Sequence, residues 1–201
     1  EMTNSDWSSD VCSSDLFLTQ LRALLRASAF GKVQIMFPMI ATLEELRRAK
    51  KYVAQAKEQL AQKGQTFDPN APVGMMVEVP AAAVLARQFA READFFSIGS
   101  NDLTQYTMAA DRMNPKVEHL SNPMGPAVLT LIAQTIQAAK QAGIPCSVCG
   151  ELAGMVEAVP VLLGLGLEKF SVSPGKLLAV RRAIAGCSEE EAQRAARRAL
   201  S

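Results

Sequence analysis

Side chains that could do chemistry follow a short apolar stretch near the middle of the chain. Residues 95–99 are apolar or small, Asn101 and Asp102 come directly after them, and Arg112 follows further along. A carboxylate is a hard oxygen ligand suited to magnesium, and a guanidinium matches phosphate with a planar fork of donors. This order of residue types predicts a site that handles a phosphorylated anion with the help of a metal ion.

A second carboxylate lies at the end of another apolar stretch. Glu78 comes near the end of residues 73–79, just before Pro80. A carboxylate in this position must be paired, solvated at the rim or bound to a metal. A salt bridge at the rim is the simpler alternative. Because Asp102 occupies the equivalent position after the next apolar stretch, the pattern favours Glu78 and Asp102 as joint ligands of one magnesium ion.

Simpler roles exist for the other polar residues as well. Asn101 and Asp102 are good N-cap residues, and they could cap a helix that starts near Leu103. The free N–H groups of such a helix start would also favour an anion. Arg112 could be a surface charge paired with Asp111, and an exposed pair of that kind contributes little stability.

The cysteines do not indicate a disulfide framework. There are four of them, too few for a disulfide-stapled fold of this size. Cys146 and Cys149 have the spacing of a metal or redox pair, but residues 144–148 are largely apolar and are expected to form a strand. Residues three apart on a strand point to opposite faces, so this pair is not expected to bind zinc. On composition alone, Cys149 would be a small core side chain.

Apolar strands and helices alternate along the rest of the chain. Strands are expected at 33–40, 73–79, 94–99, 146–149 and 170–173. Helices are expected at 17–28, 42–64, 81–91, 124–142 and 155–163, with a charged helix capped by Ser188 at the end. Strands buried on both faces that alternate with helices predict a parallel α/β sheet.

Two arrangements of such a sheet are possible, a doubly wound sheet and a (β/α)8 barrel. No Gly-x-Gly-x-x-Gly motif follows the first strand, which disfavours a dinucleotide-binding fold. Polar residues gather after several strands, at Glu78, at Asn101 and Asp102, and at 149–151. Convergence of several strand ends is typical of the C-terminal face of a barrel.

Residues 1–16 differ from the rest of the chain. They contain four acidic residues, no Lys or Arg, many serines and no helical or strand period. We expect residues 1–16 to be disordered or foreign to the domain, and residues 17–201 to form the domain itself.

Composition excludes several classes of function. A net charge of +1 gives no sign of a nucleic-acid surface. No apolar run approaches the roughly 20 residues that a membrane span needs, and no signal peptide opens the sequence. A cytoplasmic location is therefore expected. With 201 residues, 49% of them apolar, the chain suits one domain.

Three motifs in this order resemble the C-terminal phosphoenolpyruvate-binding domain of the Enzyme I family of the bacterial sugar phosphotransferase system. They are residues 74–80, 97–112 and 149–154, and the resemblance runs from about Phe17 to the end. Ser100 stands where the family more often has Thr, which keeps the hydroxyl. The resemblance implies a (β/α)8 TIM-type phosphoenolpyruvate/pyruvate barrel, truncated here to about five βα units, with an unpaired strand edge at 33–40. The missing part of the family's barrel carries two further phosphate-binding arginines.

The resemblance also implies a reaction in which phosphoenolpyruvate and a protein histidine give pyruvate and phosphohistidine. Glu78 and Asp102 would hold Mg²⁺, while Asn101 and Asp102 would contact phosphoenolpyruvate. Arg112 would clamp the phosphate. Cys149 would be the general acid–base that exchanges a proton with C3 of the enolate.

The partners implied are a histidine-containing phosphocarrier protein and a second copy of the chain in a homodimer. The acceptor histidine of the family lies on a separate N-terminal domain, so His119 is not expected to be that acceptor. The chain alone is expected to bind phosphoenolpyruvate weakly at most. Two alternatives stay open. One is a barrel of the pyruvate phosphate dikinase or phosphoenolpyruvate synthase type, which Tyr106 and residues 109–112 disfavour. The other is a non-catalytic fragment for dimerisation or regulation.

Overall fold

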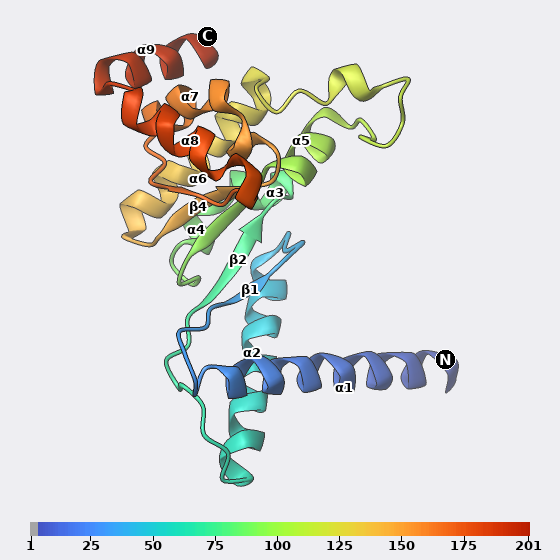
Figure 1. Cartoon of the computed structure of the whole chain (residues 1–201). Coiled ribbons are helices and arrows are strands. Elements are labelled where there is room, and N and C mark those ends of the chain that lie inside the picture. The colour runs from blue at the N-terminus through green and yellow to red at the C-terminus, as the bar shows by residue number, and fades with distance from the viewer. Residues whose placement is uncertain (1–3) are drawn as a thin grey trace. The chain divides into compact units, whose positions relative to one another are not determined.

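The computed structural model describes residues 4–201, in which short parallel strands alternate with helices (Figure 1). The strands are β1 (Ile35–Phe37), β2 (Val73–Val77), β3 (Phe96–Gly99), β4 (Cys146–Cys149) and β5 (Lys169–Phe170). The α-helices are α1 (Asn4–Ala27), α2 (Leu43–Gln62), α3 (Pro80–Val84), α4 (Ala86–Phe89), α5 (Ser100–Met108), α6 (Pro126–Ala142), α7 (Val159–Gly164), α8 (Pro174–Gly186) and α9 (Glu189–Ala199). Three short 3₁₀ segments complete this part: η1 (Glu118–Leu120), η2 (Leu152–Gly154) and η3 (Val156–Ala158).

Two compact units divide the chain. The first comprises the residues up to Met36 together with Glu44–Val73, and the second comprises Phe37–Leu43 and Gly74–Ser201. Within the first unit, the rings of Phe17 on α1 and Tyr52 on α2 meet edge to face with their centroids 5.4 Å apart. Helix α2 is amphipathic and buries its apolar stripe, made of Leu46, Ala49, Val53, Ala56 and Leu60.

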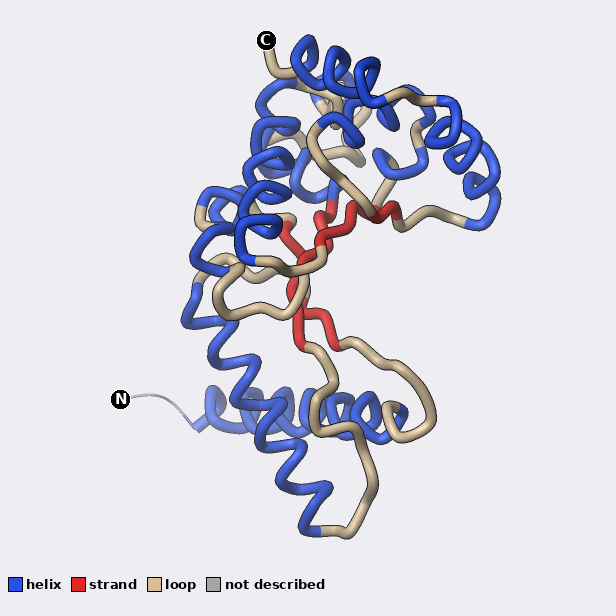
Figure 2. Tube along the Cα trace, turned by 90° about the vertical axis from the view of Figure 1, so that its left-hand side faces the viewer, coloured by secondary structure: helices blue, strands red, loops and turns tan. Residues whose placement is uncertain are grey.

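The strands follow the order β1-β2-β3-β4-β5 in one sheet (Figure 2). The pairs β2–β3, β3–β4 and β4–β5 are parallel. A sequential order of parallel strands is what successive βα units produce, since each helix returns the chain to the same end of the sheet. The predicted parallel α/β fold is therefore confirmed. A closed eight-stranded barrel is not seen, because residues 4–201 supply five strands.

The strand register gives the sheet of the second unit two different faces. One face carries side chains that are almost completely buried: Met75, Val77, Phe96, Ile98 and Val148. Helix α6 packs against β3 and β4 on this unit's sheet, and it also contacts α3 and α4 (Figure 1). Cys146 lies on this face, because it pairs with Phe96 in the register.

The opposite face of the same sheet is polar and less crowded. It carries Met76, Ser97, Gly99, Ser147 and Cys149, which alternate in register with the buried residues. The expectation that Cys146 and Cys149 point to opposite faces is therefore met by their strand geometry. Cys149 thus lies half-buried on this less buried face, which is called the open face below.

Several boundaries differ from the sequence prediction. The first strand is shorter than 33–40, because Pro38 has no N–H for a ladder and Met39 has a left-handed backbone with φ 57°. The helix expected at 81–91 is divided into α3 and α4 at Leu85, whose φ and ψ are −93° and 13°. The helix expected at 155–163 begins only at Val159, after η3. Helix α8 was not predicted, because its residues show little amphipathic period.

The first residues of the chain also differ from expectation. Helix α1 begins at Asn4, so the disorder expected for residues 1–16 is not what the structure shows from residue 4 onward; residues 1–3 lie outside the described residues. The apolar part of α1, with Leu18, Leu21 and Leu25 buried, anchors the helix. Once a helix is nucleated, each further residue adds a hydrogen bond at little cost, so a polar segment can extend it. That residues 1–16 are foreign to the domain stays a prediction.

No helix between residues 4 and 201 combines the length and apolar character that crossing a lipid bilayer would need.

Candidate active site

The ends of β2, β3 and β4 bring the predicted residues together. Gly99 ends β3 and lies opposite Cys149, the last residue of β4. On its other side, Gly99 touches Glu78, the first residue after β2. A Cβ atom on Gly99 would lie 2.8 Å from Glu78 Oε2 and 2.9 Å from Met76 Sδ. Gly99 therefore leaves the space that the Glu78 carboxylate and the Met76 thioether occupy beside the end of β3.

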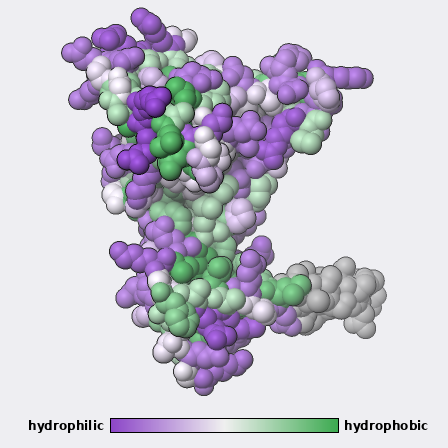
Figure 3. Space-filling model, viewed as in Figure 1, coloured by the Kyte–Doolittle hydropathy of each residue, from purple (hydrophilic) through white to green (hydrophobic). Residues whose placement is uncertain are grey.

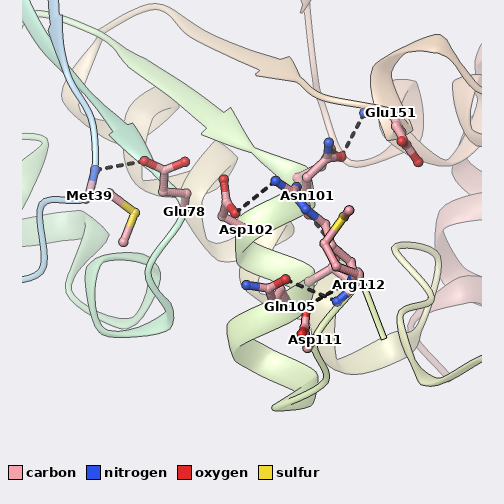
Figure 4. Close-up of polar contacts among 11 residues, drawn as sticks. Met39, Glu78, Asn101, Asp102, Gln105, Asp111, Arg112 and Glu151 are labelled. Atoms are coloured by element: carbon pink, nitrogen blue, oxygen red, sulfur yellow. Dashed lines mark hydrogen bonds and ion pairs between the residues drawn. The ribbon is translucent and has the colours of Figure 1, made fainter. Parts of the chain in front are cut away.

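Glu78 is the buried carboxylate of this site. It is only 3% exposed, and its Oε1 accepts a hydrogen bond of 2.8 Å from the N–H of Met39 (Figure 4). Burial, the main cause, raises the pKa of Glu78 above its ordinary value. The charge of Asp102 and a side-chain hydrogen bond with it also raise this pKa, whereas the Met39 N–H lowers it. The two predicted metal ligands are thus neighbours, as Figure 4 shows.

Asp102 lies in the first turn of α5 and has a cationic neighbour. Arg112 Nη2 lies 3.7 Å from Asp102 Oδ1, with side-chain exposures of 44% and 32%. The backbone N–H of Arg112 donates to Gln105 Oε1 at 3.2 Å. The carboxylate of Asp111 instead accepts the N–H of Met113 at 2.9 Å. The simpler interpretation, an ion pair of Arg112 with Asp111, is therefore replaced by a pair with Asp102.

Asn101 does not cap a helix. Helix α5 begins at Ser100 with Gly99 at the N-cap, so Asn101 and Asp102 lie inside its first turn. The Oδ1 atom of Asn101 accepts a hydrogen bond of 2.9 Å from the N–H of Glu151 (Figure 4). The simpler alternative of an N-cap role is therefore not what the structure shows, because the helix starts at Ser100, three residues before Leu103, directly after β3.

The loop after β4 fits closely over the start of α5. Gly150 has φ +85°, and a Cβ atom there would lie 2.5 Å from Ser100 Oγ and 2.8 Å from Asn101 Oδ1. Only glycine combines this backbone with so little space. The close fit fixes the backbone that carries Cys149 relative to the helix that carries Asn101 and Asp102.

Cys149 is half-buried and hydrogen-bonded at both its sulfur and its backbone. Ser97 Oγ donates to the sulfur at 3.5 Å, and the sulfur donates to the carbonyl oxygen of Ile98 at 3.4 Å. The carbonyl oxygen of Cys149 accepts from Ser100 Oγ at 2.7 Å. Cys146 has a different environment, since burial on the helix-covered face raises the pKa of its thiol to about 12.

A pocket of about 420 Å³ adjoins these residues. Its lining consists of Asn101, Thr104, Arg112, Met113, Glu118, Ser121, Pro123 and Glu151. Two of the three predicted substrate-binding residues, Asn101 and Arg112, therefore line a cavity of a size suited to a small anion. Asp102 is joined to this pocket by its ion pair with Arg112, whereas Glu78 and Cys149 are not among the lining residues.

The two neighbouring carboxylates fit a divalent cation. The pKa of Glu78 is raised partly because Asp102 places a second negative charge beside it, and a cation between them would remove this repulsion. Both groups are hard oxygen donors of the kind that Mg²⁺ takes. From residue 4 onward, no cluster of three or more His, Cys, Asp or Glu side chains could hold a metal. A magnesium ion here would therefore draw its other ligands from substrate and water.

Sequence reasoning missed several residues that build this site. Ser97 and Ser100 contact Cys149, and Gly99 makes room for Glu78. The glycine at the end of an apolar stretch was a usable signal for close approach. The N–H of Met39 had no such signal, because methionine rarely adopts a positive φ. His119 lies exposed in η1 and is not among the residues that line the pocket.

Comparison with known proteins gives a consistent result. The family described as "PEP-utilising enzyme, PEP-binding domain" matches residues 8–188. A phosphoenolpyruvate-protein phosphotransferase from Geobacillus stearothermophilus is 54% identical over 187 residues, which cover 93% of this chain and 32% of the relative. The protein of the same name from Bacillus subtilis is 53% identical over 179 residues, which cover 89% of this chain and 31% of the relative. The chain thus spans about a third of the length of these relatives.

A solved structure has a similar fold. A citrate lyase from Burkholderia xenovorans LB400 superposes with a TM-score of 0.62 at 19% identity, covering 86% of this chain and 55% of the other. This likeness concerns the fold alone.

Proposed function

Because the chain belongs to the family of PEP-utilising enzymes, as their PEP-binding domain, we propose that it binds phosphoenolpyruvate in a phosphoenolpyruvate–protein phosphotransferase. In the proposed reaction, a protein histidine takes the phosphoryl group, and the enolate that remains is protonated to pyruvate. The observation that carries the proposal is the meeting of Glu78, Asp102 and Cys149 around Gly99 at the strand ends.

Each side chain has a proposed task in this reaction. Arg112 and Asn101 line the pocket and would hold the phosphate, since a guanidinium and an amide both donate hydrogen bonds to its oxygens. Glu78 and Asp102 would hold Mg²⁺, which supplies positive charge that stabilises the transferring phosphoryl group. The ion pair of Arg112 with Asp102 places the cationic side chain next to the proposed metal ligands.

Cys149 would move the proton. When phosphate leaves, C3 of the enolate carries an electron pair that must accept a proton, and a thiol beside it can donate one. Cys149 is half-buried on the open face of the sheet and shares its end with Glu78. Cys146 lies on the opposite, helix-covered face, so it is not a candidate for the same task.

The remaining expectations follow from the family resemblance alone. They are a histidine-containing phosphocarrier protein as the next acceptor, a homodimer and a cytoplasmic location. Relatives at about 50% identity that share the name phosphoenolpyruvate-protein phosphotransferase support this reaction over that of a dikinase or synthase.

The role of Cys149 can be tested in a longer protein. We would join the N-terminal part of the Geobacillus stearothermophilus relative to this chain and measure pyruvate formation from phosphoenolpyruvate with Mg²⁺. The Cys149→Ala variant should lose about 10²–10⁴-fold in kcat, the usual contribution of a general acid. The matched control, Cys146→Ala, removes a thiol from the same strand and should retain kcat within about twofold.

Unchanged turnover in Cys149→Ala would remove the catalytic assignment. It would instead favour the alternative in which this part of the chain serves only assembly or regulation.

A further inference from the structure

Ser97 is a buried polar residue beside the proposed catalytic thiol, and the proposed function assigns it no task. It is 7% exposed and lies in the middle of β3. In the register, Ser97 is opposite Ser147, two residues before Cys149, so Ser97 and Cys149 share the open face. Its hydroxyl donates to the sulfur of Cys149 at 3.5 Å.

This hydrogen bond favours one state of the sulfur over the other. A buried hydroxyl needs a partner for its proton, and the partner of Ser97 is a sulfur atom. A neutral thiol is a weak acceptor. A thiolate in the same place is a much better acceptor, because hydrogen bonds to a charged group are about twice as strong as neutral ones. The geometry therefore places a hydroxyl donor where a thiolate of Cys149 would form.

Among the neighbours of Cys149 described below, the side chain of Ser97 is the one that donates a hydrogen bond to the sulfur. Ser100 holds the carbonyl oxygen of Cys149 at 2.7 Å, and Asn101 holds the N–H of Glu151 at 2.9 Å, so the backbone around the thiol is fixed. Gly99, directly opposite Cys149, has no side chain to offer. The carbonyl oxygen of Ile98 can accept the thiol proton at 3.4 Å but cannot donate to a thiolate.

We propose that Ser97 is a positioning residue that stabilises the thiolate of Cys149 while the proton is exchanged with the enolate. This inference rests on the proposed function. In the forward step, the S–H bond of Cys149 breaks and its proton joins C3, where the electron pair of the enolate forms the new C–H bond. The sulfur keeps the electron pair of the S–H bond and becomes a thiolate, and the O–H of Ser97 donates to it. The reverse step takes the proton back from the methyl group of pyruvate.

The first test measures the thiolate without any substrate. In the chain carrying Cys12→Ser, Cys146→Ala and Cys187→Ser, Cys149 is the single cysteine, and its alkylation by iodoacetamide can be followed against pH. Ser97→Ala should move the midpoint of this profile upward by about 0.5–1 pH unit, which corresponds to a roughly threefold to tenfold slower reaction at neutral pH.

Two controls separate the hydrogen bond from general disturbance. Ser147 lies on the same face, but its hydroxyl donates to the carbonyl oxygen of Phe96 at 3.5 Å, so Ser147→Ala should leave the profile in place. Ser97→Thr and Ser97→Val have the same shape and differ only in the hydroxyl. The Thr variant should keep the parent profile and the Val variant should show the shift, which provides the test even if Ser97→Ala does not fold.

The second test asks whether the stabilised thiolate matters for turnover. In the longer protein described above, Ser97→Ala should lower kcat for pyruvate formation about threefold to tenfold with KM for phosphoenolpyruvate unchanged, and Ser97→Thr should restore it. An alkylation profile that does not move in Ser97→Ala or Ser97→Val overturns the inference, whatever the activity. A shifted profile with unchanged kcat overturns the positioning role. Failure of the proposed function has a different signature, namely full turnover in Cys149→Ala.

Discussion

At the scale of single residues, the site is organised by one carboxylate that is costly to ionise. Glu78 is buried, lies beside Asp102 and accepts a backbone hydrogen bond from the N–H of Met39. Burial and the neighbouring negative charge both favour the protonated form, and they outweigh the single hydrogen bond. A protein that tolerates such a group for stability alone would be unusual. A divalent cation bound between Glu78 and Asp102 would compensate the repulsion between these two carboxylates.

The raised pKa of Glu78 predicts how Glu78→Gln changes stability with pH. The folded chain holds the Glu78 proton up to a higher pH than the unfolded chain, whose carboxyl has its ordinary pKa near 4.5. The stability that Glu78 contributes is therefore present below about pH 4.5 and is lost as the pH rises through the raised pKa. Gln cannot ionise, so Glu78→Gln should match the parent at pH 4.5 and exceed it in Tm at pH 7.5, by about 2–4 °C per kcal/mol recovered.

Magnesium should reverse the order of the Tm values of the parent and Glu78→Gln at pH 7.5. At pH 7.5, adding millimolar Mg²⁺ should raise the Tm of the parent, since a ligand that binds only the folded state stabilises it, and should leave Glu78→Gln unchanged. Thermal unfolding by circular dichroism at both pH values would show this. A Tm difference that is the same at pH 4.5 and 7.5 would contradict the assigned cause.

At the scale of elements, sequence pattern located strands well and details of backbone poorly. A strand that contains Cys146 and Cys149 was predicted and is observed as β4, and the expected convergence of Glu78, Asp102 and Cys149 followed from strand ends that carry polar residues. The direct run from β3 into α5 was not foreseen, so a helix start near Leu103, with Asn101 or Asp102 as a possible cap, was placed three residues too late. Local propensity does not tell how many residues separate two packed elements, because tertiary packing decides this.

Helix α8 shows the same limit in another way. Its sequence has few periodic apolar positions, and Leu177 and Leu178 remain exposed by 46% and 74%. Figure 3 shows hydrophobic side chains gathered on the surface over this helix. Helices are predicted from a periodic apolar stripe that faces a core, and the sequence of α8 lacks such a stripe. Beside α8, the helices α7 and α9 pack closely against each other.

That contact gives a prediction about helix packing. Gly164 ends α7, and a Cβ atom on it would overlap the carbonyl group of Ala192 and lie 2.8 Å from Ala196 Cβ on α9. Because the obstacle is mostly backbone, α9 must move away in Gly164→Ala. We expect a loss of about 1–3 kcal/mol or more in the free energy of unfolding, measured by urea titration.

The matched control is Gly186→Ala. Gly186 is the last residue of α8, as Gly164 is of α7, and a Cβ atom there would meet nothing within 4 Å. This variant should remain within about 0.5 kcal/mol of the parent or gain slightly, since Ala is the better helix former. Equal effects of the two substitutions would show that helix propensity, and not the α7–α9 contact, governs stability here.

At the scale of the whole molecule, the chain corresponds to about a third of its relatives. Five strands in sequential order leave β1 and β5 at the edges of the described sheet. Edge strands expose N–H and C=O groups that another strand can pair with. The relatives' remaining length is where the family resemblance locates two further phosphate-binding arginines. By this expectation, the residues that carry the chemistry and the residues that supply much of the affinity for phosphate lie in different parts of a longer protein.

This separation predicts a large difference in affinity for phosphoenolpyruvate. In the chain alone, the cation lining the pocket is Arg112, whose side chain is 44% exposed and already paired with Asp102. One screened, shared guanidinium supplies little net binding energy, so calorimetry with Mg²⁺ should give a dissociation constant of about 1 mM or weaker. Each further charge-assisted hydrogen bond to phosphate is worth about 1.5–3 kcal/mol.

The longer protein with the Geobacillus stearothermophilus segment should therefore bind phosphoenolpyruvate at least about tenfold more tightly than the chain alone, since 1.4 kcal/mol is a factor of ten. Arg112→Lys in that protein keeps the charge but removes the planar fork and should weaken binding again. Micromolar affinity of the chain alone would refute the view that groups outside it are needed. It would mean that Asn101, Arg112 and the metal held by Glu78 and Asp102 are sufficient to hold the substrate.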